Sequence, residues 1–104
     1  MSDRTGQGQW IDTCLFDSAV AMMAVMNLNY LVTGKPPARA GNAHQNIVPY
    51  QVFPVADGHI IIAIGTDRQF REYCTLIGTP ALPDDTRFAT NRARVENRDA
   101  LIAL

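Results

Sequence analysis

The sequence predicts a small α+β protein, in which a long buried helix leads through a linker into a small antiparallel β unit with covering helices. Three observations support this fold class. A largely apolar segment covers residues 17–33, a stretch rich in Pro, Gly, Ala and Asn follows at 35–46, and two β-branched and aromatic runs then flank a short turn. We expect residues 1–34 to form a strand and helix, 35–46 a linker or loop, and 47–104 a small α+β domain.

Residues 9–15 are typical of a short strand leading into the apolar segment. Asp17 or Ser18 suits an N-cap, because its side-chain oxygen can accept an unpaired backbone N–H of the first helical turn, and Gly34 provides a stop. Apolar side chains occur on almost every face of the helix predicted at 17–33, including a methionine cluster. This pattern indicates burial in a core or an interface.

A β-hairpin is predicted from residues 50–55 and 59–64, which are separated by Ala56, Asp57 and Gly58. Glycine adopts positive φ without strain, so we expect Gly58 to do so in the turn. The second strand is nearly continuous in apolar residues. We therefore expect it to be covered on both faces.

Two further helices follow the hairpin. Thr66 or Asp67 can cap the first, whose apolar residues fall three and four positions apart: Phe70, Tyr73, Cys74 and Ile77. Thr90 or Asn91 opens a last helical stretch that continues to Leu104 without a stop signal. The sequence alone thus suggests a small domain that is truncated at its C-terminal end.

Composition and charge argue against several classes of partner. A net charge of -1, a pI near 6.0 and the lack of runs of Lys or Arg argue against nucleic-acid binding. The apolar segment is shorter than the about 20 residues of a membrane span, and Asn27 and Asn29 interrupt it, so we expect no membrane insertion. Cys14 and Cys74 are far apart and lie in apolar patterns, which favours two buried free thiols and a cytoplasmic location.

Nucleotide and metal motifs are weak. Gly6 and Gly8 precede the predicted strand, whereas a dinucleotide motif needs its glycines between a strand and a helix. No spacing of Cys or His suits zinc, so we predict no metal site. Charged side chains near the C-terminus are interpreted as the solvated face of a helix: Arg92, Arg94, Glu96 and Arg98.

Three segments carry a family resemblance: GQGQWIDTCLFDSAVAMM at 6–23, RAGNAHQNIVPYQVFPVADGHIIIAIG at 39–65 and LPDDTRFATNRARVENRD at 82–99. Together they resemble the middle of class III CoA-transferases, a group that includes formyl-CoA and carnitine CoA-transferases and 2-methylacyl-CoA racemases. The resemblance implies transfer of CoA between an acyl-CoA and a carboxylic acid, and interlocked dimers. It also implies that the acyl-accepting aspartate lies upstream, so that this chain corresponds to an inner fragment.

The resemblance assigns no catalytic residue here, since neither Asp12 nor Asp17 matches the position of the nucleophile. It implies that CoA thioesters are the family substrate, with no cofactor held by this chain alone. The loop 39–46 corresponds to one at the edge of the active site, and four of its residues are candidates for substrate contact: Gly41, Asn42, His44 and Gln45. An ordinary surface turn is an equal alternative for these residues.

We therefore expect a CoA-transferase fragment that is inactive by itself and dimeric. Two alternatives remain open at this point. One is a fragment of a racemase-type enzyme, which would move a proton α to a thioester carbonyl. The other is a non-catalytic domain that oligomerises through its apolar helix at 17–33.

Overall fold

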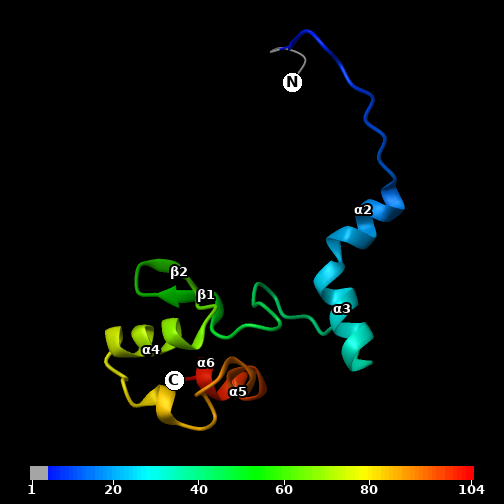
Figure 1. The fold of residues 1–104 in the computed structure, drawn as a ribbon. Coiled ribbons are helices and arrows are strands. Elements are labelled where there is room, and N and C mark those ends of the chain that lie inside the picture. Colours follow the sequence, from blue (N-terminus) through cyan, green and yellow to red (C-terminus); the bar gives the residue numbers. More distant parts are fainter. Residues whose placement is uncertain (1–4) are drawn as a thin grey trace. The chain divides into compact units, whose positions relative to one another are not determined.

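The structure is a computed structural model that describes residues 5–104, and the chain divides into two compact units, Met1–Arg39 and Ala40–Leu104 (Figure 1). The division lies inside the segment 35–46 that the sequence marks as a linker. Each unit is described by itself below.

The first unit contains two helices, α2 (Leu15–Met22) and α3 (Ala24–Thr33), which meet at Met23 with a bend of 66°. The prediction of one unbroken helix is therefore wrong. The strand expected at 9–15 is also absent, since residues 9–14 form neither helix nor strand and Leu15 already belongs to α2. α3 ends as predicted at Gly34, whose φ of 68° is left-handed.

The start of α2 differs from the expected cap. Cys14 is the N-cap and makes no side-chain capping bond, while Asp17 lies in the first turn. There the carboxylate still interacts favourably with the positive end of the helix dipole. Neither Asp17 nor Ser18 is the cap, because the helix begins earlier than the polar residues suggested.

The expected burial of this helical segment is wrong for the chain by itself. No residue of α2 or α3 is buried, and Met22 and Leu31 are 85% and 77% exposed. Cys14, for which burial was also expected, is exposed, and so is the neighbouring Trp10. No single helix among residues 5–104 has the length and apolarity of a membrane span, although α2 and α3 reach both when taken together as a bent pair.

The second unit begins with the predicted antiparallel hairpin, β1 (Tyr50–Val55) and β2 (Gly58–Ala63). Val55 pairs with Gly58, so only Ala56 and Asp57 form the turn. Gly58 belongs to β2 and its φ is not positive, contrary to our expectation. The two-residue turn places the strand start one residue earlier than the sequence indicated.

Helix α4 (Asp67–Leu76) follows the sequence prediction closely. Thr66 accepts from the backbone N–H of Gln69, and the Gln69 side chain accepts from the Thr66 backbone N–H, which completes a capping box. Phe70 and Cys74, four residues apart, are buried. Gly78 adopts φ 80° just after the helix ends.

A short 3-10 turn, η1 (Leu82–Asp84), leads to α5 (Asn91–Glu96) and α6 (Arg98–Ile102). Thr90 caps α5 as predicted, by accepting from the Ala93 N–H. The continuous last helix that we expected is interrupted at Asn97, whose side-chain amide donates to the Ala93 carbonyl at 2.9 Å. Such local side-chain bonds compete with regular helix geometry.

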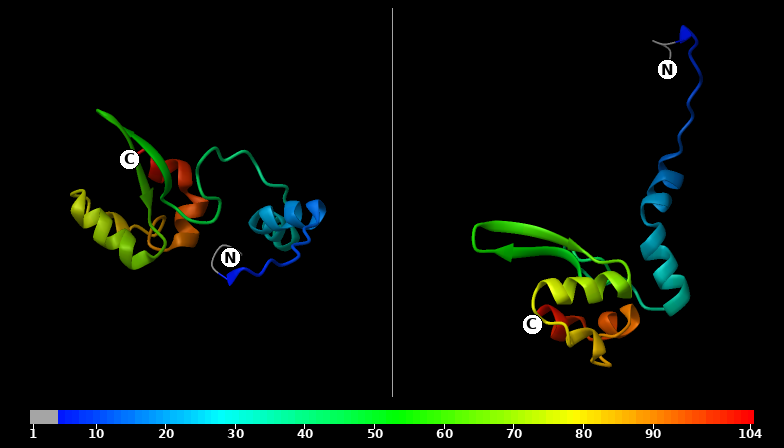
Figure 2. Two further views of the ribbon diagram at one scale, coloured as in Figure 1. Left: turned by 90° about the horizontal axis from the view of Figure 1, so that it is seen from above. Right: turned by 60° about the vertical axis from the view of Figure 1, so that its left-hand side comes forward.

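The core of the second unit lies on one side of the hairpin, where α4 and the α5–α6 pair pack (Figures 1 and 2). Its six buried apolar residues come from five segments of the chain: Val48, Ile64, Phe70 and Cys74 of α4, Phe88 and Leu101. Ile62 packs against this core, whereas Ile61 is 73% exposed. The prediction that β2 is covered on both faces is therefore wrong within this chain.

Candidate functional site

The loop that carries the four predicted site residues starts with a turn at 40–43. Gly41 has a φ of +60°, and the Ala43 N–H donates to the Ala40 carbonyl at 3.0 Å. A side chain at Gly41 would meet no other atom, but L residues rarely adopt this left-handed conformation. The glycine is therefore required by backbone geometry rather than by a close neighbour.

His44 is fixed through its backbone and its ring. Its N–H donates to the Tyr50 carbonyl at 2.9 Å, and its imidazole stacks on the Tyr50 ring with centroids 5.2 Å apart and planes 12° from parallel. Its Nδ1 accepts the backbone N–H of Asn46 at 3.1 Å. Because an accepting Nδ1 carries no proton, the neutral ring carries its proton on Nε2 and presents that N–H as its donor.

Asn42 joins the loop to the hairpin. Its Oδ1 accepts the backbone N–H of Val52 in β1 at 3.1 Å. The amide group keeps its Nδ2 donors for other partners. Gln45 is half-buried, and its carbonyl oxygen is held from α6. The structure thus brings Gly41, Asn42 and His44 together on one supported loop beside β1.

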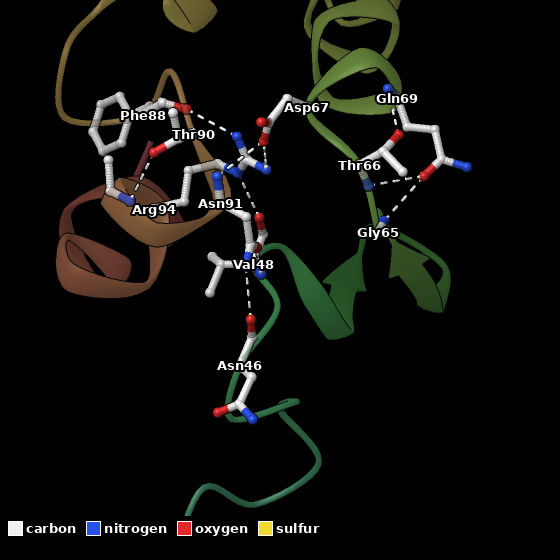
Figure 3. A network of polar contacts seen from close by, with 11 residues as sticks. Asn46, Val48, Gly65, Thr66, Asp67, Gln69, Phe88, Thr90, Asn91 and Arg94 are labelled. Carbon is white, nitrogen blue, oxygen red and sulfur yellow. Dashed lines mark hydrogen bonds and ion pairs between the residues drawn. The ribbon is translucent and has the colours of Figure 1, made fainter. Parts of the chain in front are cut away.

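The support comes from two side chains of the last helices. Arg98 Nη2 donates to the carbonyls of His44 at 2.7 Å and Gln45 at 2.9 Å. Asn91 Nδ2 donates to the Asn46 carbonyl at 2.8 Å, and Asn91 Oδ1 accepts the Val48 N–H at 3.2 Å (Figure 3). Backbone groups of residues 44–48 are therefore held by side chains that lie more than 40 positions further along the chain.

Arg94 is the centre of this network and is fully buried (Figure 3). Its Nε donates to the Val48 carbonyl at 2.7 Å and its Nη1 to the Phe88 carbonyl at 3.0 Å. Its Nη2 pairs with Asp67 Oδ1 at 2.8 Å, and its guanidinium lies 4.4 Å from the centre of the Phe70 ring. Each guanidinium nitrogen thus has a hydrogen-bond partner, and the side chain links α5 to Val48, to Phe88 and to α4.

The sequence interpretation of Arg94 and Arg98 as solvated charges is therefore wrong. Their partners are mainly backbone carbonyls, which leave no mark in the residue pattern. The seven-residue spacing from Arg94 to Leu101 would place both on one face of a continuous helix, but α5 and α6 are separate helices that break at Asn97. Arg92 and Glu96, by contrast, are exposed and pair with each other, as that interpretation expects.

The other titratable groups supply no obvious reactive centre. Burial raises the pKa of the Cys74 thiol, opposed in part by the nearby Thr79 hydroxyl and by Arg94 and Arg71. A raised pKa keeps this thiol protonated and poorly nucleophilic. Asp12 and Asp17 are exposed. Within residues 5–104, no three His, Cys, Asp or Glu side chains are grouped closely enough to hold a metal ion.

The fold and this loop define a small α+β domain with a backbone-supported polar loop. Comparison with known proteins identifies its family. The family model of CoA-transferase family III matches residues 1–104, and the chain belongs to this family.

Characterised relatives agree with this assignment. The chain is 53% identical over 95 residues to succinate–glutarate CoA-transferase of Agrobacterium fabrum, a match that covers 91% of this chain and 24% of that protein. It is 41% identical over 101 residues to human succinyl-CoA:glutarate CoA-transferase, covering 97% of this chain and 23% of that one. The chain thus spans about a quarter of the length of these relatives.

Solved structures show the same relationship. A CAIB/BAIF family protein from Brucella suis is 54% identical, with a TM-score of 0.63 over 98% of this chain and 27% of that one. Rv3272 from Mycobacterium tuberculosis is 28% identical, with a TM-score of 0.66 over 98% of this chain and 25% of that one. The predicted family and α+β fold class are confirmed.

Proposed function

We propose that this chain is part of an enzyme that moves CoA from an acyl-CoA to a dicarboxylic acid. The observation that carries the proposal is the 53% identity to a succinate–glutarate CoA-transferase. A second relative, acetyl-CoA:oxalate CoA-transferase of Acetobacter aceti, is 41% identical and also has a dicarboxylate in its name. These relatives are named as transferases, which favours transfer over the racemase alternative.

In this proposal the loop 41–46 binds the acceptor and the transferase nucleophile lies outside this chain. The Nε2–H of His44 and the Nδ2 of Asn42 are donors on one loop, and both side chains are oriented by hydrogen bonds through their other polar atom. Donors that are already oriented stabilise a carboxylate or a developing oxyanion without reorganisation. Gly41 permits the turn that brings the two residues together.

The test uses a chimaeric enzyme in which this chain replaces the matching segment of the Agrobacterium fabrum protein. We expect the chimaera to transfer CoA from succinyl-CoA to glutarate, and to prefer glutarate to pentanoate, which has the same length but one carboxylate. An inactive but folded chimaera would contradict the proposal.

His44→Ala in the chimaera should lower kcat by about 10²-fold, as loss of an oriented donor does at other sites of acyl transfer. The matched control is His59→Ala, since His59 is exposed on β2 and outside the loop. Thermal unfolding should change little in either variant. Equal rates for the two would leave the loop without a role in transfer.

The chain alone should have no transferase activity, because the covalent route needs its nucleophile. Incubation with succinyl-CoA followed by mass spectrometry checks this directly. An acyl or CoA adduct on Asp12 or Asp17 would show that a nucleophile is present here after all.

The cytoplasmic location expected from the two dispersed cysteines stays a prediction.

We also propose that the enzyme is a homodimer whose contacts include α2 and α3. The support is the exposure of large apolar side chains along both helices, among them Leu28, Leu31 and Val32. Soluble monomers rarely expose continuous apolar surface of more than a few hundred Å². Light scattering of the chain and of Met23→Asp tests this, with a dimer and a monomer as the expected results.

A further inference from the structure

The hydrogen bonds that hold the loop 41–46 point to a function for a residue outside it. Arg98 lies at the start of α6, yet a single nitrogen of its guanidinium binds two successive carbonyls, those of His44 and Gln45. The side chain is only partly exposed. Two charge-assisted bonds to neighbouring peptides fix the orientation of both peptide planes.

We propose that Arg98 is a positioning residue. By holding the carbonyl of His44, it sets the direction in which the Nε2–H of that side chain points. This inference rests on the proposed function and identifies a residue that supports the same site. Arg98 touches no substrate in this scheme. Its effect passes through the backbone of His44 and through the imidazole seated on Tyr50.

Two features distinguish this contact from ordinary packing. First, the bonds of Arg98 end on the backbone of the predicted site residues themselves, whereas those of Arg94 end on Val48, Phe88 and Asp67. Second, the ring of His44 is also held at Nδ1 by the Asn46 N–H, so a shift of the peptides at 44–46 changes both its direction and its tautomer. Arg98 therefore controls the geometry of the donor more than the cohesion of the core.

The experiment compares Arg98→Ala, Arg98→Lys and Arg92→Ala in the chimaeric transferase. Arg92 is the matched control, since it lies on α5 and its exposed pair with Glu96 does not reach the loop. We expect Arg98→Ala to lower kcat by at least about tenfold, because misplacement by about 1 Å can cost up to 10²-fold, and to raise the KM for glutarate, because the same loop binds the acceptor. Arg98→Lys should recover part of the rate, and Arg92→Ala should match the parent.

A second measurement follows the loop without activity. In the 104-residue chain, nitrogen chemical shifts of the His44 ring report the tautomer, and amide exchange reports the order of residues 44–48. We expect Arg98→Ala to mix the tautomers and to raise amide exchange in the loop, while exchange in α4 stays unchanged.

The outcomes separate the two proposals. If the parent chimaera is inactive, the proposed function fails and this inference fails with it. If the parent is active and Arg98→Ala has the kcat of the Arg92 control, only the positioning role is overturned. The positioning role is also overturned if the His44 tautomer is unchanged in Arg98→Ala, whatever the kcat of that variant.

Discussion

The two units of this chain contain apolar residues in abundance, but among residues 5–104 only the second unit buries them. In the first unit, α2 and α3 are largely apolar and contain no buried residue. In the second unit, a fully buried arginine lies among Phe70, Phe88 and Val48. Burial is therefore set by which partners the fold brings together. Composition alone would have placed α2 and α3 inside and Arg94 outside.

Truncation of apolar side chains should show the largest difference between the units. Phe88→Ala removes a fully buried ring and should lower the free energy of unfolding by about 4 kcal/mol. Leu31→Ala removes an exposed side chain and should change it by less than about 0.5 kcal/mol in the monomer. Urea unfolding of the two variants measures both values.

Unfolding at several protein concentrations tests whether association covers the apolar helices. If α2 and α3 are covered in a dimer, the effect of Leu31→Ala should grow as the concentration rises, since association then contributes to stability. The effect of Phe88→Ala should not depend on concentration. A cost for Leu31→Ala as large as that for Phe88→Ala in dilute solution would remove the contrast between the units.

Arginine replacement tests the polar side of the comparison. Arg94→Met leaves the Val48 and Phe88 carbonyls without their buried donor, and we expect a loss of about 3 kcal/mol. Asp67 remains about half exposed, so its charge stays solvated and adds little to the loss. The matched control, Arg92→Met, removes an exposed pair and should cost less than about 1 kcal/mol. Equal losses would mean that the network is not a source of stability.

The smallest expected effect comes from a surface carboxylate of the second unit. Hydrogen bonds from the Arg87 side chain, and then from its backbone N–H, hold the pKa of Asp85 below its usual value. A lowered folded-state pKa stabilises the protein above the pKa of the unfolded carboxyl, and this contribution is lost as the pH falls through the folded value. Asp85→Asn should therefore be slightly less stable than the parent at neutral pH.

Urea unfolding of the parent and of Asp85→Asn between pH 7 and pH 2 checks this sign. The difference between them should shrink as the pH falls below the ordinary carboxyl range. A difference that is the same at every pH would assign the effect to packing. Because Arg87 is exposed and Asp85 is partly exposed, added salt should also reduce the difference.

The elements that were predicted correctly are specified by residues that lie close together in the sequence. The start of α4 follows from Thr66 and Gln69, three positions apart, and the hairpin follows from two β-rich runs around one turn. The predictions failed where contacts with residues far away in the sequence determine the structure. The strand at 9–15 has no neighbouring strand among the described residues, and the outer face of β2 has no covering layer.

The candidate site divides in the same way. Its residues were predicted from the loop sequence, because Gly41, Asn42 and His44 are unusual together and belong to a recognisable family segment, and their role in binding stays a prediction. Their support was missed, since Asn91 and Arg98 bind backbone atoms that every residue possesses. A main-chain carbonyl can accept a hydrogen bond whatever side chain its residue has, so the sequence does not show which residues accept.

The hold of Arg98 on the carbonyls of His44 and Gln45 has a consequence for how the proposed transferase can change its substrate. Every amino acid at positions 44 and 45 offers the same two carbonyl oxygens, so the support does not depend on which side chains the loop presents. The identity of these side chains can therefore vary over generations, or in a saturation library, while the main chain keeps its path. If the loop binds the acceptor as we propose, acceptor preference is an evolvable property of a few positions on a constant main chain.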